Sequence, residues 1–323
     1  MKILSMDELP ADLDTQFAAL TLLDGDLPWG RPTAGLLSRL GVPYSEDKGF
    51  AAVERDRVLG RIETYVVPYR TPAGTEPAVW VSGVVTDPGH LGRGVASALL
   101  KEAHLRERGR GHRWAFLWTH RSWGAHRLYE SLGYRDAYSP PAAARRLTSR
   151  AGASLSGAYT TRAARASEAD LLERLLHAST RSRYGFVPRT PGSFRTRFRL
   201  GWRRASDHML LLRDSVPVGY AFATKGRLGL MATEVVVTQP RGAASMLDAL
   251  ERRTGNGWLA LARTTFITDN DALLRRRGYQ IYGRTHPVMM AKPLMASSTG
   301  PRSADPFVLY RNPRFSFQGG DSF

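Results

Sequence analysis

The residues best suited to bind an anion lie between positions 84 and 100. The β-branched run that ends at Val84–Thr86 is typical of a strand, and Asp87-Pro88-Gly89 is a strong turn signal. Gly92 and Gly94 then precede an Ala- and Leu-rich segment with the composition of a helix. Glycines let a backbone approach a ligand, and the first amides of a helix have no partner within it, so this loop can hold a pyrophosphate. The same residues also suit an ordinary corner between a strand and a helix.

A second segment, Ser122–Tyr134, has the spacing of a helix that ends at Gly133. Its apolar residues recur at helical intervals, at Ala125, Leu128, Tyr129 and Leu132. A strand, a glycine loop and two helices in this order are more specific than the glycine loop alone.

Together the two segments resemble the acetyl-CoA signature of the GNAT superfamily of N-acetyltransferases. The matching residues are Pro88, Gly92, Gly94 and Ala96 in the first segment and Ala125, Leu128, Tyr129, Gly133 and Tyr134 in the second. The chain departs from the signature at Leu91, where the family usually has Arg or Gln, and at Ser122, where it usually has Asn. Leu91 removes one phosphate contact but no backbone amide, and the Ser122 hydroxyl can still form a hydrogen bond.

The resemblance implies a site for acetyl-CoA on a mixed sheet. It places the thioester carbonyl at strand amides near Val84, Val85 and Thr86. It places the rest of the cofactor at the loop and the two helix starts, on Gly92, Arg93, Gly94, Val95, Ala96, Ser97 and Ser122. It also implies that Tyr129 protonates the leaving sulfur, the alternative being a tyrosine packed in the core. The base stays open between four residues: Glu63, Glu76, Asp87 and His120.

The second half of the chain repeats the first, because segments that begin at Val235, Trp258 and Asp271 echo earlier strands and a helix. The predicted fold class is α/β (α+β), with two tandem GNAT-like domains, each a mixed and mostly antiparallel sheet flanked by helices. The predicted ranges are 1–148 for the acetyl-CoA-binding domain, 149–157 for a linker, 158–295 for a second domain, and 296–323 for a tail that folds back on the body.

The second copy lacks the residues of the site and is expected to be degenerate. Its loop after Pro240 keeps only Gly242, and Leu274 stands where the first copy has Tyr129. This tandem pattern resembles the enhanced-intracellular-survival acetyltransferases, which acylate amines of aminoglycosides and of lysine and use a C-terminal carboxylate as base. The resemblance makes Phe323 a second catalytic candidate; the alternative is an aromatic tail that covers an apolar groove.

The chain is strongly basic, with 46 Lys and Arg against 29 Asp and Glu and a net charge of +17. The stretch Arg181–Arg204 interleaves arginines with aromatic residues and holds no acid, a pattern that suits phosphate contact and base stacking. RNA or another anionic partner is one interpretation of this stretch. A solvated arginine-rich face whose aromatic residues belong to the core is the other.

Composition narrows the remaining possibilities. The 323 residues include no cysteine, which excludes disulfides and thiolate sites, and the eight histidines lack ligand spacing, so we expect no metal. The sequence has no membrane-length apolar run and no signal-peptide pattern, so we expect a cytoplasmic protein without a membrane partner.

The expected function is direct transfer of an acetyl group from acetyl-CoA to a primary amine of a small molecule, such as an amino acid, an amino sugar or an antibiotic-like metabolite. One alternative is an acyltransferase that acts on a tRNA-borne or other anionic substrate. The other is a non-catalytic regulator that binds acyl-CoA or RNA.

Overall fold

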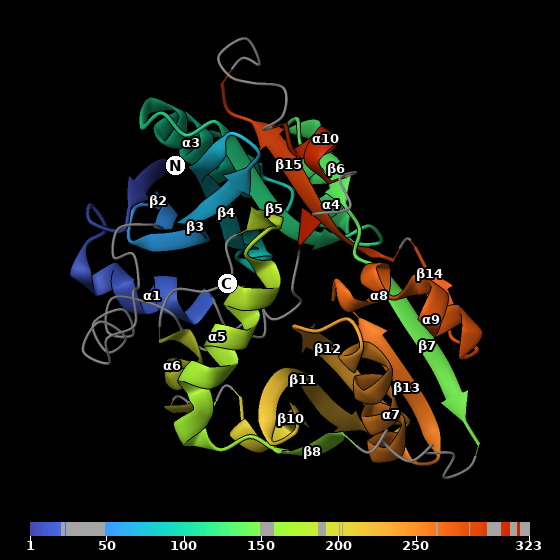
Figure 1. Cartoon of the computed structure of the whole chain (residues 1–323). Helices are drawn as coiled ribbons and strands as arrows, with labels where there is room; N and C mark the ends of the chain where they lie inside the picture. The colour runs from blue at the N-terminus through green and yellow to red at the C-terminus, as the bar shows by residue number, and fades with distance from the viewer. Residues whose placement is uncertain are drawn as a thin grey trace. The chain divides into compact units, whose positions relative to one another are not determined.

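A computed structural model describes residues 1–20, 23, 49–148, 158–186, 192–199, 201, 203–262, 264–283, 285–295, 305–310 and 315–316 (Figure 1). The chain forms two compact units. The first unit comprises Met1–Tyr138 and His286–Tyr310, and the second unit comprises Ser139–Thr285 and Arg311–Phe323. Among the described residues, no helix is long and apolar enough to cross a membrane.

The first unit is built on a sheet whose strands lie in the order β1-β2-β3-β4-β5-β15-β6. Their bounds are β1 Lys2–Ser5, β2 Gly49–Glu54, β3 Arg57–Thr71, β4 Gly74–Thr86, β5 Trp114–His120, β15 Pro287–Pro293 and β6 Arg135–Tyr138. The first four strands form an antiparallel meander, and helix α3 (Val95–Gly109) then crosses over so that β5 runs parallel to β4. The other helices of this unit are α1 Asp14–Ala19, α4 Gly124–Ser131 and α10 Pro306–Leu309.

Alternating side chains give this sheet two apolar faces. On β2, Phe50 and Ala52 pack in the core that α3 and α4 share, whereas Ala51 and Val53 pack with Phe17 of α1. The sheet therefore has α3 and α4 on one side and α1 on the other. The loop that precedes α3 leads from the end of β4 to the α3 side of the sheet.

The second unit repeats this order, with a sheet β8-β10-β11-β12-β13-β7-β14. The strands are β8 Tyr159–Ala163, β10 His208–Arg213, β11 Val216–Gly226, β12 Gly229–Val237, β13 Gly257–Ala262, β7 Ala142–Leu147 and β14 Gln280–Tyr282. The helices are α5 Ala169–Thr180, α6 Ser193–Arg199, α7 Gly242–Thr254, α8 Phe266–Asp269 and α9 Asp271–Arg276, and a short β9 (Tyr184–Phe186) pairs with β16 (Phe315–Ser316). Again a meander precedes one parallel crossover, so the predicted fold class of two related mixed sheets is confirmed.

Two strands exchange places between the halves of the sequence. Strand β7 lies inside the predicted range 1–148 but pairs with β13 and β14 of the second unit. Strand β15 lies inside the predicted range 158–295 but pairs with β5 and β6 of the first unit. Periodicity predicts that each segment is a strand, but the two sheets offer equivalent edges, and the sequence pattern does not show which edge each strand joins.

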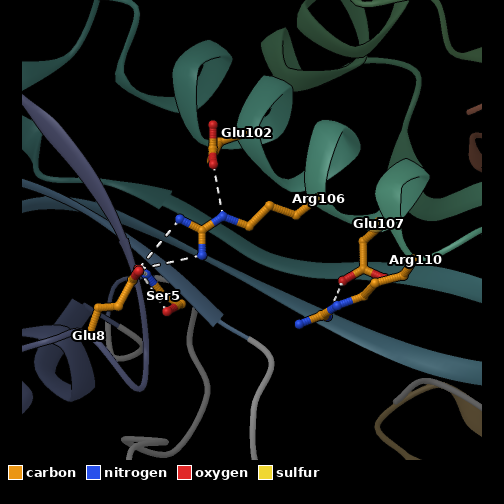
Figure 2. Close-up of polar contacts among 6 residues, drawn as sticks. All are labelled: Ser5, Glu8, Glu102, Arg106, Glu107 and Arg110. Atoms are coloured by element: carbon orange, nitrogen blue, oxygen red, sulfur yellow. Dashed lines mark hydrogen bonds and ion pairs between the residues drawn. The ribbon is translucent and has the colours of Figure 1, made fainter.

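Polar residues of α3 tie the first strand and the turn after it to this helix (Figure 2). Arg106 Nε donates to Glu102 Oε1 at 2.8 Å, and its guanidinium reaches Glu8 Oε2 at 3.4 Å. Glu8 also accepts from the amide and the hydroxyl of Ser5, and these bonds, with Arg106, hold its pKa below the ordinary value. The turn after β1 is thereby held against α3.

The exchanged strand β15 carries Lys292 to a buried histidine. Lys292 Nζ lies 3.1 Å from His104 Nδ1, and His104 Nε2 lies 2.8 Å from the Tyr134 hydroxyl. Because an ammonium group only donates, Nδ1 accepts and Nε2 carries the proton toward Tyr134. Burial, together with the charge of Lys292, lowers the pKa of His104 to about 3.

Because the pKa of His104 is lowered, we expect the free energy of unfolding to fall in mild acid. His104 stays neutral in the folded chain, whereas in the unfolded chain it takes up a proton near its ordinary pKa of 6.5. The contribution of the neutral His104 to the free energy of unfolding should therefore be fully present above pH 6.5. It should be lost as the pH falls toward 3, by up to about 1.4 kcal/mol per pH unit. Urea unfolding across this range should show a flatter profile for His104→Gln than for the exposed-site control His286→Gln. Equal profiles for the two variants would contradict the assignment.

Candidate functional site

Strands β4 and β5 pair over a short length and then both continue. Their parallel register joins Val79–Val81 with Ala115–Leu117, whereas β4 runs on to Thr86 and β5 to His120. In the described part of the chain this leaves the edge of β4 that faces β5 without a strand partner beyond Val81. The residues predicted to hold the thioester carbonyl, Val84, Val85 and Thr86, lie in this diverging stretch.

A bulge in β4 begins at the same place. The register of β3 with β4 shifts between Arg61 and Glu63, and Gly83 adopts a left-handed φ of 53°. Bulges bend a strand and end regular pairing, so this one accounts for the divergence from β5.

Asp87 shapes the turn after β4. Its carboxylate accepts from the Gly89 amide and from Arg57 Nη2, each at 2.8 Å. These two hydrogen bonds, from Gly89 first and then Arg57, hold the pKa of Asp87 below its ordinary value. Asp87 therefore caps the turn.

The glycine loop leaves backbone amides open at the start of α3. Gly92 and Gly94 have φ angles of 74° and 78°, and a side chain built on either would meet no described atom within 4 Å. Ala98 N donates to Gly94 O at 3.0 Å, so the amides of Val95, Ala96 and Ser97 precede the first helical hydrogen bond. The loop thus has the form of an anion site at the positive end of a 15-residue helix.

The loop carries two side chains, Leu91 and Arg93, and only Arg93 is charged. Leu91 is exposed and offers nothing to an anion. Arg93 is half exposed, with Nη2 3.7 Å from Glu54 Oε2, a surface pair that holds a side chain loosely. Arg93 can therefore add a cation to the amides.

Helix α4 brings Tyr129 into the core on the α3 side of the sheet. Its ring is nearly buried and meets Tyr134 edge to face at 5.9 Å. Ser122 precedes this helix, and its hydroxyl lies 2.6 Å from His120 Nδ1 at the end of β5. The His120 ring in turn stacks on Trp123 at 5.6 Å and on His286 at 5.2 Å.

The start of α4 is clamped by a carboxylate that the sequence analysis missed. Asp136 on β6 accepts from His126 Nε2 and from Arg121 Nε, each at 2.8 Å. Partial burial alone would raise the pKa of Asp136, but these two bonds hold it below the ordinary value. Tyr129 stands one turn after His126, so this clamp orients its helix. No spacing rule links Asp136 to Arg121 and His126 before the fold is known.

The structure separates the four candidate bases. Glu76 forms an ion pair with Arg113 at 3.0 Å near the start of β4, far along the strand from the divergence. Glu63, in contrast, pairs in register with Ser82, beside the bulge. Glu63 and His120 are therefore the two candidates that lie where β4 and β5 diverge.

Glu63 is held from both sides. One of its oxygens pairs with the fully buried Arg61, and the other accepts from the Tyr65 hydroxyl. A side chain built on Gly83 would lie 3.5 Å from the Glu63 carboxyl carbon and 3.4 Å from Arg61 Nη2. The missing side chain at the bulge thus leaves room directly beside this carboxylate.

In the second unit the corresponding features are closed. The parallel register ends at Ala232 and Leu261, and Thr264 Oγ1 then lies 3.3 Å from both Val235 N and Val235 O. Gly242 begins α7, and a side chain there would meet Val237 at 2.9 Å. The Thr264 hydroxyl thus occupies the edge of β12 that corresponds to the open edge of β4. The open glycine loop of the first unit is replaced by the crowded Gly242.

Two other predicted features are only partly described. Phe323 lies outside the described residues. Of the described tail residues, 305–310 pack on the first sheet: Phe307 lies 6.2 Å from Trp114 and Tyr310 lies 5.6 Å from Tyr138.

In the stretch Arg181–Arg204, Phe194 is buried in a core with Tyr220, and the partly buried Phe198 packs against the same core. Its described arginines include three that form ion pairs: Arg183 with Asp269 at 2.5 Å, Arg195 with Asp170 at 2.7 Å and Arg203 with Glu234 at 3.0 Å. The buried Phe194 ring is therefore not available to stack on bases.

Comparisons with known proteins agree with this geometry. Residues 37–137 match the family model of the acetyltransferase (GNAT) domain. No curated protein sequence matches the chain.

Among solved structures, a GCN5-related N-acetyltransferase from Kribbella flavida is 17% identical with a TM-score of 0.63, over 90% of this chain and 70% of that one. Eis1 from Mycobacterium abscessus is 16% identical with a TM-score of 0.64, over 91% of this chain and 74% of that one. A tandem GNAT protein from the clavulanic acid biosynthesis pathway is 14% identical with a TM-score of 0.50, over 92% and 99%.

At these identities the solved structures show the fold, and the family match shows which half carries the signature. The matched residues 37–137 include the diverging strands β4 and β5 and the open glycine loop. Residues 37–137, in the first unit, carry a GNAT acetyltransferase domain.

Proposed function

We propose that this chain transfers an acetyl group from acetyl-CoA to a primary amine of a small molecule, by direct attack. The family supports acyl transfer in general. The observation that carries the finer proposal is the coincidence of three features: strands that diverge after Val81, a loop of open amides before α3, and a carboxylate beside the bulge.

The residues present suit acetyl-CoA. The amides of Val95, Ala96 and Ser97, with Arg93, would hold its pyrophosphate, because helix N-termini favour anions. The unpaired edge of β4 near Val84 would hold the pantetheine arm and the thioester carbonyl. Acetyl-CoA supplies an activated acyl carbon whose leaving group is a thiolate.

For this transfer the substrate nitrogen must lose two protons and the leaving sulfur must gain one. The Glu63 carboxylate, placed beside the bulge, would take the first proton from the substrate ammonium, and Arg61 and Tyr65 keep that carboxylate in position. As the N–C bond forms and the C–S bond breaks, the Tyr129 hydroxyl would give its proton to the leaving sulfur, and the second proton of the acylated nitrogen would return to the tyrosinate. The Asp136 clamp would keep α4 in the orientation that this requires.

Calorimetric titration of acetyl-CoA tests the first step. Gly94→Glu should weaken binding by about 100-fold or more, because it adds a negative charge where the phosphates are expected and a side chain at a left-handed φ. Gly111→Glu is the matched control: Gly111 also has a left-handed φ, of 84°, also faces open space, and follows the other end of the same helix.

Micromolar binding that Gly94→Glu abolishes and Gly111→Glu preserves would support the cofactor site and justify a screen of amine substrates. If neither the wild-type chain nor the control binds acetyl-CoA, the proposal fails at its first step. Equal losses in both variants would point to strain in α3 and not to an anion site.

A further inference from the structure

The second sheet has an apolar surface that the described residues leave open. On β13, Leu259 and Leu261 pack in the core under α7, whereas Trp258 points to the opposite face and is 45% exposed. Tyr282 on β14 lies on the same face as Trp258 and is also 45% exposed. Figure 1 shows β7 and β13 as the long strands of this part of the sheet, with α7 and α9 nearby. We call this surface the open face. Its residues are Met231, Trp258, Ala260, Ala262, Ala142, Ala144, Arg146, Gln280 and Tyr282.

The first sheet provides an internal comparison. In both sheets the parallel register ends at a leucine, Leu117 or Leu261, so Trp114 occupies the position of Trp258. Trp114 is only 6% exposed and lies against Phe307 of α10.

The tyrosines correspond in the same way. In the first sheet, Met289 is register-paired with both Tyr138 and Trp118 on its two neighbouring strands. In the second sheet, Ala142 is register-paired in the same way with both Tyr282 and Ala262. Tyr138 packs against Tyr310, which follows α10. The first unit covers its tryptophan and tyrosine, and the second unit, as far as it is described, leaves the equivalent pair exposed.

The floor between the two aromatic residues is flat. Where the first sheet has Phe116, Trp118 and Met289, the second has Ala260, Ala262 and Ala142. Trp258 and Ala262 are four residues apart on β13, so the floor is about 13 Å long, since a strand rises about 3.3 Å per residue. A planar ring can lie on this floor without meeting a bulky side chain.

The charge around the open face is positive. Arg146 is register-paired with Trp258, and Arg227 precedes Leu228, whose carbonyl accepts from Trp258 N at 2.9 Å. Both arginines are exposed and form no ion pair among the described residues. The open face itself contains no Asp or Glu.

The second unit also concentrates the charge of the whole chain. Residues 139–285 contain 25 Lys and Arg and 10 Asp and Glu, a net of +15 out of +17. Such a surplus attracts polyanions and disfavours contact between two copies of the same surface.

We propose that the open face binds single-stranded nucleic acid, with bases on Trp258 and Tyr282 and phosphates at Arg146 and Arg227. Base stacking on exposed aromatic rings and phosphate contact by arginine are the two elements of such sites. A duplex hides the faces of its bases, so a single strand is the form that this surface fits. The site is distinct from the acetyl-CoA loop and does not depend on the proposed transfer.

Fluorescence anisotropy with a labelled single-stranded oligouridine tests the proposal in the full-length protein. Trp258→Ala should weaken binding by about 5- to 150-fold, the usual range for loss of one stacked base. Arg146→Ala should reduce the slope of log affinity against log salt by about 0.7, the value for one phosphate contact on a single strand. The matched controls are Trp123→Ala and Arg108→Ala, which remove an exposed aromatic ring and an exposed arginine from the first unit.

Each outcome decides the proposal. Binding that falls with Trp258→Ala or Arg146→Ala, but not with the controls, supports it. Absence of oligouridine binding to the wild-type protein at low ionic strength overturns the proposal. It is also overturned if all four variants bind the oligouridine with the same affinity and the same salt dependence. A duplex that competes as well as the single strand would also overturn it. So would light scattering that shows a dimer which Trp258→Ala dissociates, because the open face would then be a protein interface.

Discussion

The Tyr129→Phe variant should lower kcat for acetyl transfer by about 10²- to 10⁴-fold, with little change in the affinity for acetyl-CoA. General acid catalysis contributes in this range, and without the hydroxyl the leaving thiolate must depart unprotonated. Phenylalanine keeps the edge-to-face packing on Tyr134, so the core on this side should survive. Steady-state kinetics with an amine found by screening, together with calorimetry of acetyl-CoA, measure the two quantities separately.

Two further variants serve as a control for Tyr129→Phe and as a test of the proposed base. Tyr134→Phe removes a hydroxyl from the same core, where it bonds to His104, and should leave kcat nearly unchanged. Glu63→Gln should lower kcat/KM for the amine, while acetyl-CoA still binds, because only the acceptor side loses a base. If Tyr129→Phe retains full kcat, Tyr129 is a packing residue and the acid must be sought elsewhere.

A chain that ends at residue 148 should fail to fold cooperatively, although it contains the whole acetyl-CoA signature. It lacks β15, whose residues Val288, Met289 and Met290 are fully buried between β5 and β6. Burial of three such side chains is worth about 5–9 kcal/mol, which is comparable to the entire stability of a typical domain. It also lacks Lys292, so His104 would lose its hydrogen-bond donor.

The rescue is a chain in which residues 1–138 are joined by a flexible linker to residues 286–310. This chain contains the complete first unit and should regain a cooperative thermal transition in circular dichroism. A cooperative transition for residues 1–148 with the melting temperature of the full chain would show that β15 is dispensable.

The sequence alone predicted the parts whose determinants are local. Turn chemistry at Asp87-Pro88-Gly89, the two glycines of the loop and the helical spacing around Tyr129 all depend on residues within a few positions of one another. The structure accordingly has β4, the glycine loop, α3 and α4 in the predicted order. The internal repeat was also readable, because the same strand and helix patterns recur in the same order.

Tertiary structure decided what depends on partners far apart in the chain. It moved β7 and β15 into each other's predicted domain, because two sheets with equivalent edges differ only in which strand packs better on each core. It separated Glu63 from Glu76 and Asp87, since a carboxylate's use depends on its neighbours: the bulge at Gly83, the ion pair with Arg113, or the turn at Gly89.

The same distinction explains the basic second half. Composition showed the excess of arginine, and spacing pointed to the aromatic residues near Arg181–Arg204. The fold instead buries Phe194 and exposes Trp258, because α5 and α6 cover one half of that sheet face and, among the described residues, leave β13 and β7 uncovered. Which aromatic ring meets solvent is a property of how layers pack, and a pattern of neighbouring residues does not contain it.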